Sequence, residues 1–147
     1  ILTHLATKKQ EITVFGGKQM RPNLHIKDMC NFYEFLLEAD TKLVGNKTFN
    51  ISDENISIEN IALKIKDIFK NKYNLDILIK KVESEDDKRS YHLNSDKIKK
   101  ELNFDLKYSV DDAITDIYSL LQTGKFDDSL VNDIYYNIKT LKKLKIT

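Results

Sequence analysis

Residues 12–29 read ITVFGGKQMRPNLHIKDM, and this stretch decides the fold class. Its first four residues, 12–15, are β-branched or aromatic and predict a short strand. The pair Gly16-Gly17 ends that strand in a turn, and residues 24–26 predict a second short extended run. The apolar residues then follow a helical spacing, at Met29, Phe32, Tyr33, Leu36 and Leu37. Strand and helix therefore alternate over a short length of chain.

The same alternation extends in both directions from this stretch. Residues 1–9 predict the end of a helix, Ser57 caps a long amphipathic helix, and Ser109 with Asp112 has the pattern of a capping box. The other expected elements are strands at 48–51 and 76–79, an extended run at 91–93, a brief helix capped by Ser95, and a last helix from about Ser129 with Leu130, Ile134, Ile138 and Leu141 facing inward. Short strands between helices indicate an α/β or mixed α+β fold. They suit a small substrate-binding lobe better than a full doubly wound sheet.

Length and composition limit the function classes. The 147 residues fit one domain, and 41% hydrophobic with 32% charged residues exclude general disorder. With 24 basic and 23 acidic side chains the net charge is +1, so no overall charge attracts nucleic acid or an anionic membrane. No apolar run is long enough to cross a bilayer. The single cysteine, Cys30, favours a reducing compartment. We therefore expect a cytoplasmic protein with no nucleic-acid and no membrane partner.

The first residues indicate a longer parent protein. Ile1-Leu2-Thr3 enters a helical pattern with no capping side chain ahead of it, whereas a helix normally opens with one. We interpret residues 1–147 as a single lobe from a longer chain. The alternative is a complete small protein with a trimmed N-terminus.

Several familiar catalytic patterns are missing from the sequence. It contains no GxGxxG turn after a strand, no GxxxxGK[ST] phosphate loop and no GxSxG elbow. His4, His25 and His92 do not stand at metal-ligand spacing, and we expect each of them to be structural. Cys30 is expected to be a buried, inert thiol. The acidic pair at 86–87 is expected to lie in a solvated loop, so no catalytic and no metal-binding residue is predicted.

Arginine is rare in this chain. It supplies two of the 24 cations, Arg21 and Arg89. A lysine covers a surface as well as an arginine does, but the planar guanidinium fork grips a phosphate or carboxylate in two places. Both arginines lie in polar, loop-like segments, which is what a diphosphate site requires. The residues alone leave two alternatives open, chance placement or structural ion pairs such as Arg89 with Asp86.

Two segments resemble the motifs of a known family. Residues 15–29 resemble the stretch fG.G.Q.R...hv.D., and residues 87–98, continued by 101–104, resemble D.RsY.ls..Ki...LgF. In order and spacing, the chain is similar to the C-terminal end of the extended short-chain dehydrogenase/reductases, which are NAD-dependent nucleotide-sugar epimerases and dehydratases. The resemblance continues through residue 124 and covers nearly the whole chain. Where many relatives have glycine before the final aromatic residue, this chain has Asn103, which a left-handed turn tolerates.

The resemblance implies a C-terminal substrate-binding lobe. In the family, an N-terminal Rossmann domain binds the dinucleotide, and a smaller C-terminal lobe holds the nucleotide diphosphate of the sugar. The substrate-binding residues implied by position are Arg21 and Arg89 on the diphosphate, Gln19 and Tyr91 beside them, and Val14 on the strand that borders the base. Asp28 and its helix would pack on the dinucleotide domain, which is a structural role.

The resemblance also limits what the chain does alone. The family's glycine-rich turn and catalytic Tyr-x-x-x-Lys are missing, and the spacing of Tyr135 and Lys139 is coincidental. NAD or NADP would therefore serve the parent enzyme, an epimerase, dehydratase or reductase, and this chain alone would bind neither and show no turnover. The implied partners are a nucleotide-diphosphate sugar, the Rossmann domain and, in the parent, a second copy in a homodimer. The alternative is a stand-alone, non-catalytic module for nucleotide diphosphates or for another protein.

Overall fold

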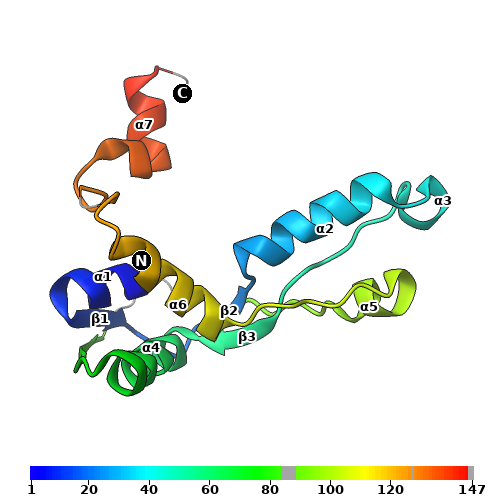
Figure 1. The fold of residues 1–147 in the computed structure, drawn as a ribbon. Coiled ribbons are helices and arrows are strands. Elements are labelled where there is room, and N and C mark those ends of the chain that lie inside the picture. Colours follow the sequence, from blue (N-terminus) through cyan, green and yellow to red (C-terminus); the bar gives the residue numbers. More distant parts are fainter. Residues whose placement is uncertain (84–88, 127, 146–147) are drawn as a thin grey trace.

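The structure is a computed structural model that describes residues 1–83, 89–126 and 128–145. Within them, short strands alternate with helices (Figure 1). The elements are α1 (Leu2–Lys9), β1 (Glu11–Phe15), β2 (Met20–Asn23), α2 (Ile26–Glu38), α3 (Thr41–Val44), β3 (Glu54–Ser57), α4 (Ile58–Tyr73), β4 (Leu78–Val82), α5 (Asp96–Leu102), α6 (Val110–Leu121), the 3₁₀ turn η1 (Asp133–Tyr135) and α7 (Asn137–Lys143). The mixed α/β fold class predicted from the sequence is confirmed.

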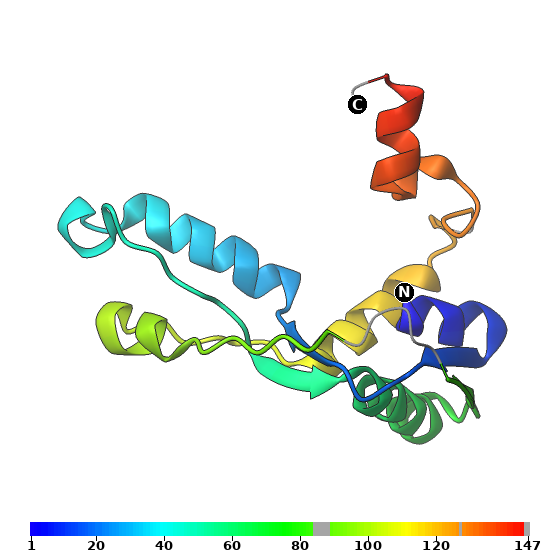
Figure 2. The ribbon, with the colours of Figure 1, turned by 180° about the vertical axis from the view of Figure 1, so that it is seen from behind.

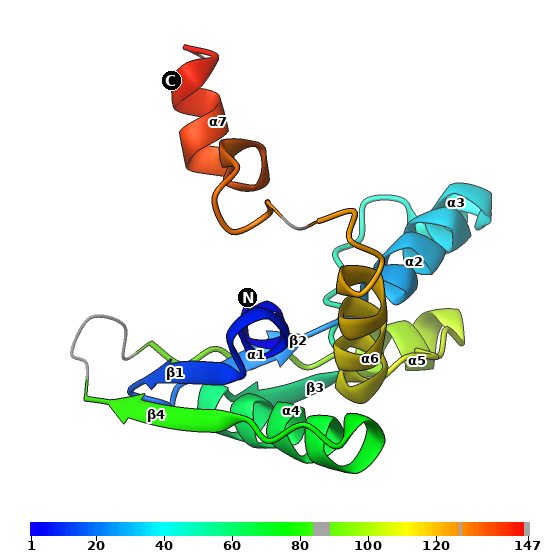
Figure 3. The same ribbon diagram turned by 60° about the vertical axis from the view of Figure 1, so that its left-hand side comes forward.

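Two strand pairs organise these elements. β1 and β4 run parallel, with Glu11 opposite Leu78 and Phe15 opposite Val82, and they lie side by side in Figure 3. β2 and β3 run antiparallel, with Met20 opposite Ser57. The chain thus leaves β1, turns at the glycine pair and enters a second, separate sheet.

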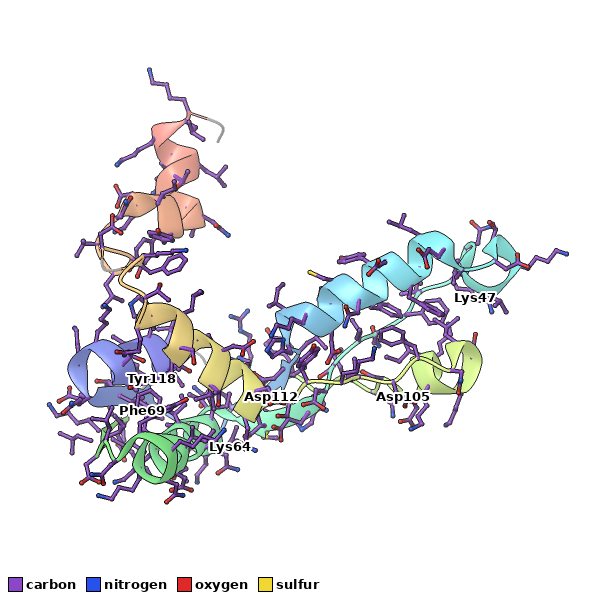
Figure 4. All side chains as sticks on the ribbon, viewed as in Figure 1. Lys47, Lys64, Phe69, Asp105, Asp112 and Tyr118 are labelled. Carbon is purple, nitrogen blue, oxygen red and sulfur yellow. The ribbon has the colours of Figure 1, made fainter. Side chains whose placement is uncertain are left out.

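The larger core lies in what we call the sheet lobe, made of α1, β1, α4, β4 and α6. Its buried residues are Ala6, Ile12, Val14, Ala62, Ile65, Ile68, Phe69, Ile77 and Ile114. The rings of Phe69 and Tyr118 meet edge to face with their centroids 5.1 Å apart, which joins α4 to α6 (Figure 4). One continuous core therefore holds both strands and three helices together.

Local capping predictions hold in the helices of this lobe. Ser57 Oγ accepts a hydrogen bond from the N–H of Asn60 at 3.2 Å and caps α4. At the start of α6, Ser109 and Asp112 form both bonds of a capping box. Outside this lobe, α5 ends at Leu102, and its C-cap Asn103 has a left-handed φ of 51°, as expected. These features depend on neighbours in the sequence, which is why the sequence predicts them.

A smaller core lies in an arm that extends away from the sheet lobe (Figures 1 and 2). We call residues 26–51 and 95–104, with α2, α3 and α5, the aromatic arm. Its buried residues are Phe32, Ile98 and Leu102, and the rings of Phe35, Phe49 and Phe104 pack around them. The centroids of Phe32 and Phe104 are 5.0 Å apart. Aromatic rings and aliphatic side chains therefore pack together in the arm.

Asp28 joins the base of the arm to the segment that leads into α6. Its buried carboxylate accepts hydrogen bonds from the N–H of Lys107, 3.1 Å from each oxygen, and from the N–H of Tyr108 at 2.9 Å. The ring of His25, the N-cap of α2, stacks on Tyr108 with centroids 4.9 Å apart. Asp28 therefore has a structural role within this chain, and packing of its helix on a dinucleotide domain stays a prediction.

Three local predictions are wrong. Residues 48–51 form no strand and instead run as an extended connection between α3 and β3 (Figure 1). The second extended run is β2 and not residues 24–26, and it contains Pro22, which an edge strand accommodates because no N–H is required there. Ser95 occupies the N-cap position of α5 but its side chain makes no capping bond, and Asn94 Oδ1 accepts the N–H of Asp96 at 2.9 Å.

The C-terminal segment and the cysteine also differ from expectation. The helix expected from about Ser129 is replaced by η1 and a short α7. The side chains expected to face inward, Leu130, Ile134, Ile138 and Leu141, are not buried, and Ile138 is 71% exposed. Cys30 is exposed on α2 and not buried. Helical spacing predicts which face is apolar, but burial also needs an element packed against that face.

Candidate functional site

Residues 89–91 lie against β2. The N–H of Met20 donates to Ser90 Oγ at 3.1 Å, and the N–H of Tyr91 donates to the carbonyl of Met20 at 3.1 Å. These bonds join positions about 70 residues apart in the sequence. They place Arg21 of β2 beside residues 89–91.

Arg21, Arg89 and Tyr91 form one cluster at this contact. The guanidinium carbon of Arg21 is 5.2 Å from the centroid of the Tyr91 ring, and that of Arg89 is 5.9 Å from the same centroid. Arg21 Nη1 also donates to the carbonyls of Met20 and Arg89. The Tyr91 side chain is 45% exposed, so the cluster reaches the surface. Three of the residues predicted to bind substrate are therefore brought together.

The cluster has the chemistry to bind a doubly charged anion. Two guanidinium groups within 6 Å of one ring concentrate positive charge on a small area. Planar guanidinium forks bind phosphate oxygens in pairs, and diphosphate offers such oxygens on two phosphorus atoms. The sequence also left open an ion pair between Arg89 and Asp86. Asp86 lies outside the described residues.

Gln19 occupies the turn between β1 and β2. Its Oε1 accepts the N–H of Gly17 at 2.7 Å, and its Nε2 donates to the carbonyl of Phe15 at 2.8 Å. Gly16 and Gly17 adopt φ values of 68° and 105°, a region that strongly favours glycine. Gln19 thus stabilises the turn that leads to Arg21. A direct contact of Gln19 with substrate stays a prediction.

Val14 lies inside the sheet lobe. Its side chain is 0% exposed and packs in the core with Ile12 and Ala62. A ligand beside β1 could therefore meet the backbone of this strand but not the valine side chain. That the strand at residues 12–14 borders the nucleotide base stays a prediction.

Asn55 and Ser90 were not singled out from the sequence. Besides the bond of Ser90 to Met20, the Asn55 side chain forms two hydrogen bonds with the backbone of Leu93, each of 2.9 Å. Asparagine is unfavourable in strands, and Asn55 stands within β3. An asparagine within a strand was therefore the one sequence feature that could have drawn attention to Asn55.

The histidine environments described are structural. His25 Nδ1 accepts the N–H of Lys27 at 3.1 Å, and its Nε2 lies 3.5 Å from Asp116. His4 Nε2 lies 3.2 Å from Ser129 Oγ, and burial lowers the pKa of His4. Among the described residues, no group of three His, Cys, Asp or Glu side chains is arranged to hold a metal ion.

A separate apolar groove of about 640 Å³ lies between the start of α2 and one face of α6. Its walls include Leu24, Ile26, Ala113, Ile117 and Leu120. The groove shares no lining residue with the arginine cluster. In the described part of the chain, no helix is both long and apolar enough to span a membrane.

The mixed α/β fold of this chain is similar to part of several solved enzyme structures. One similar structure is L-threonine dehydrogenase from Clostridium difficile, with 23% identity and a TM-score of 0.69 over 84% of this chain and 39% of that one. Another is dTDP-glucose 4,6-dehydratase from Bacillus anthracis, solved with NAD, with 19% identity and a TM-score of 0.63 over 84% and 38% of the two chains. A third is UDP-N-acetylglucosamine 4-epimerase from Bacillus cereus, with 23% identity and a TM-score of 0.64 over 83% and 43%.

The comparisons establish the fold and the extent of the likeness. The chain spans about two fifths of the length of these enzymes. No protein-family model and no curated protein matches it by sequence. The similar structures include enzymes named for an amino acid and enzymes named for nucleotide sugars, so the fold by itself does not select a substrate class.

Proposed function

We propose that this chain is the C-terminal, nucleotide-sugar-binding part of a cytoplasmic NAD(P)-dependent epimerase, dehydratase or reductase. The observation that carries the proposal is the convergence of Arg21 and Arg89 on the ring of Tyr91. A threonine substrate has one carboxylate and no phosphate, whereas a nucleotide sugar carries a diphosphate that two guanidinium groups match. The cluster therefore favours the nucleotide-sugar enzymes among the similar structures.

The chain as a whole would act by binding the substrate and orienting it. Arg21 and Arg89 would hold the diphosphate, and Tyr91 would keep the two guanidinium groups close together. Binding energy from the nucleotide handle would position the sugar for reaction, which raises the rate without a reacting group on this lobe. NAD or NADP in the parent supplies the hydride chemistry.

The described residues do not fit the dinucleotide itself. Among them, the glycine turn after β1 most resembles a phosphate cradle, and its groups are already engaged. Gly17 donates its N–H to Gln19, while the N–H groups of Ile58 and Glu59 at the start of α4 donate to the carbonyls of Gln19 and Gly17. The helix N-terminus that would face a phosphate is thereby occupied by the chain's own carbonyls.

The proposed partner of this chain is a Rossmann domain of the same parent enzyme. The outer face of α2 exposes Ile26, Tyr33 and Leu37, and the apolar groove beside Ile26 continues this surface toward α6. Large apolar surfaces of this kind mark interaction sites. A homodimeric parent belongs to the same proposal.

Calorimetric titration with UDP, dTDP and ADP tests the function. We expect the wild type to bind at least one of these diphosphates. Arg21→Ala and Arg89→Ala should each weaken that binding by about 1.5–3 kcal/mol, because each removes charged hydrogen bonds. Lys142→Ala, on the distant α7, is the matched control for loss of a cation. Unchanged affinity in both arginine variants would refute the site assignment.

A further inference from the structure

Residues 89–93 cross the β2–β3 pair without joining it as a strand. At one end, the segment bonds to Met20 of β2 through Ser90 and Tyr91. At the other end it bonds to β3, where Asn55 meets Leu93. Within the described residues, β2 therefore holds this segment at residues 89–91, and a single side chain of β3 holds it at Leu93.

Asn55 contacts Leu93 as a strand backbone would. Its Oδ1 accepts the N–H of Leu93 at 2.9 Å, and its Nδ2 donates to the carbonyl of Leu93 at 2.9 Å. A primary amide is the side-chain group that offers a donor and an acceptor in one plane, as a peptide does. Leu93 cannot shift along the sheet without losing both bonds together.

We propose that Asn55 is a positioning residue for the diphosphate site. By fixing Leu93, it holds Tyr91 and Arg89 within reach of Arg21, and the cluster loses its shape when this bond pair is lost. The inference rests on the proposed function, and it adds a residue that touches no ligand. Asn23 supports the same cluster from within β2, since its Nδ2 donates to the carbonyl of Arg21 at 2.8 Å.

Asn55→Asp is the sharpest variant. It keeps the size of the side chain but removes the donor and sets a carboxylate against the carbonyl of Leu93. We expect UDP affinity to fall about tenfold, the equivalent of about one net hydrogen bond. Amide exchange at Tyr91 and Leu93 should become faster. Asn71→Asp, the same change on the exposed side of α4, is the control and should alter neither.

Acidification provides a readout that a general loss of stability would not give. When the carboxylate introduced by Asn55→Asp takes up a proton, it regains a donor beside its acceptor, as in the amide. The UDP affinity of Asn55→Asp relative to Asn71→Asp should therefore recover as the pH falls from 7 toward 4. Asn55→Gln, which keeps both groups on a longer stem, should lose less affinity than Asn55→Asp and serves if the aspartate variant does not fold.

The outcomes separate the inference from the function. Wild-type binding of UDP with unchanged affinity and unchanged Leu93 exchange in Asn55→Asp overturns the inference alone. Wild type that binds no nucleoside diphosphate overturns the proposed function, and the positioning role is rejected with it. Loss of affinity, faster local exchange and recovery in acid together support both.

Discussion

The sheet lobe and the aromatic arm belong to one chain but differ in how completely each closes its own core. In the lobe, strands and helices surround a buried cluster that includes Ile12, Ile65 and Phe69. In the arm, α2 covers a small aromatic core with one face and exposes the other, where Leu37 is 88% exposed. The lobe thus buries its core among its own strands and helices, whereas the arm leaves one face of α2 exposed.

The largest expected effect separates the two cores. Phe69→Ala removes a fully buried ring and should lower the free energy of unfolding by about 3–5 kcal/mol. Phe32→Ala should open the arm locally and shift the unfolding of the lobe much less, because stability is distributed unevenly between regions. Thermal unfolding combined with amide exchange measures both. Equal loss of protection in the lobe and the arm after Phe32→Ala would contradict the separation.

The link between the two regions is the next test. Asp28→Asn replaces a buried carboxylate that accepts from Lys107 and Tyr108 with a group that points a donor at one of them. We expect a loss of about 1–3 kcal/mol in unfolding free energy. The control is Asp67→Asn on the exposed side of α4. If the denaturation curve of Asp28→Asn matched that of Asp67→Asn, Asp28 would not be the link between the lobe and the arm.

A smaller effect is expected from the cap of α6. Ser109→Ala removes the hydroxyl that binds Asp112, and the loss should be about 1 kcal/mol. Ser119→Ala, exposed on the same helix, should be close to neutral. Urea unfolding distinguishes the two, and equal midpoints would mean that the capping box contributes nothing to stability.

The smallest effect concerns pH. Hydrogen bonds from the side chain and the backbone N–H of Ser109 lower the pKa of the Asp112 carboxyl from its usual 3.8. Because the folded pKa lies below the unfolded one, the stabilisation is complete above the unfolded pKa and is lost as pH falls through the folded pKa. Asp112→Asn should therefore flatten part of the decline in stability between pH 5 and pH 2. A decline identical to that of the wild type would contradict this assignment.

The sequence predicts short-range features better than features that depend on distant parts of the chain. Ser57, Ser109 and Asn103 act through neighbours a few residues away, so their roles follow from spacing alone. The strand predicted at 48–51 and the inward face predicted for Ile138 require partners that spacing does not specify. Apolar periodicity states a preference for burial, and tertiary packing decides whether burial occurs.

The candidate site divides in the same way. Arg21 and Arg89 are conspicuous because arginine is rare in the chain, and the family resemblance adds Tyr91. Their meeting depends on bonds between Met20 and residues 90–91, about 70 positions away, which no local pattern predicts. Asn55 has no local signal beyond being an unfavourable residue in a strand. Long-range backbone pairing therefore determines the part of the site that the sequence does not reveal.

The most direct test of the central claim is a map of amide chemical shifts during UDP titration. We predict that the shifts centre on Arg21 and residues 89–91, with little change along α6. Shifts confined to Ile117, Leu120 and the apolar groove, with Arg21 and Tyr91 unchanged, would contradict it.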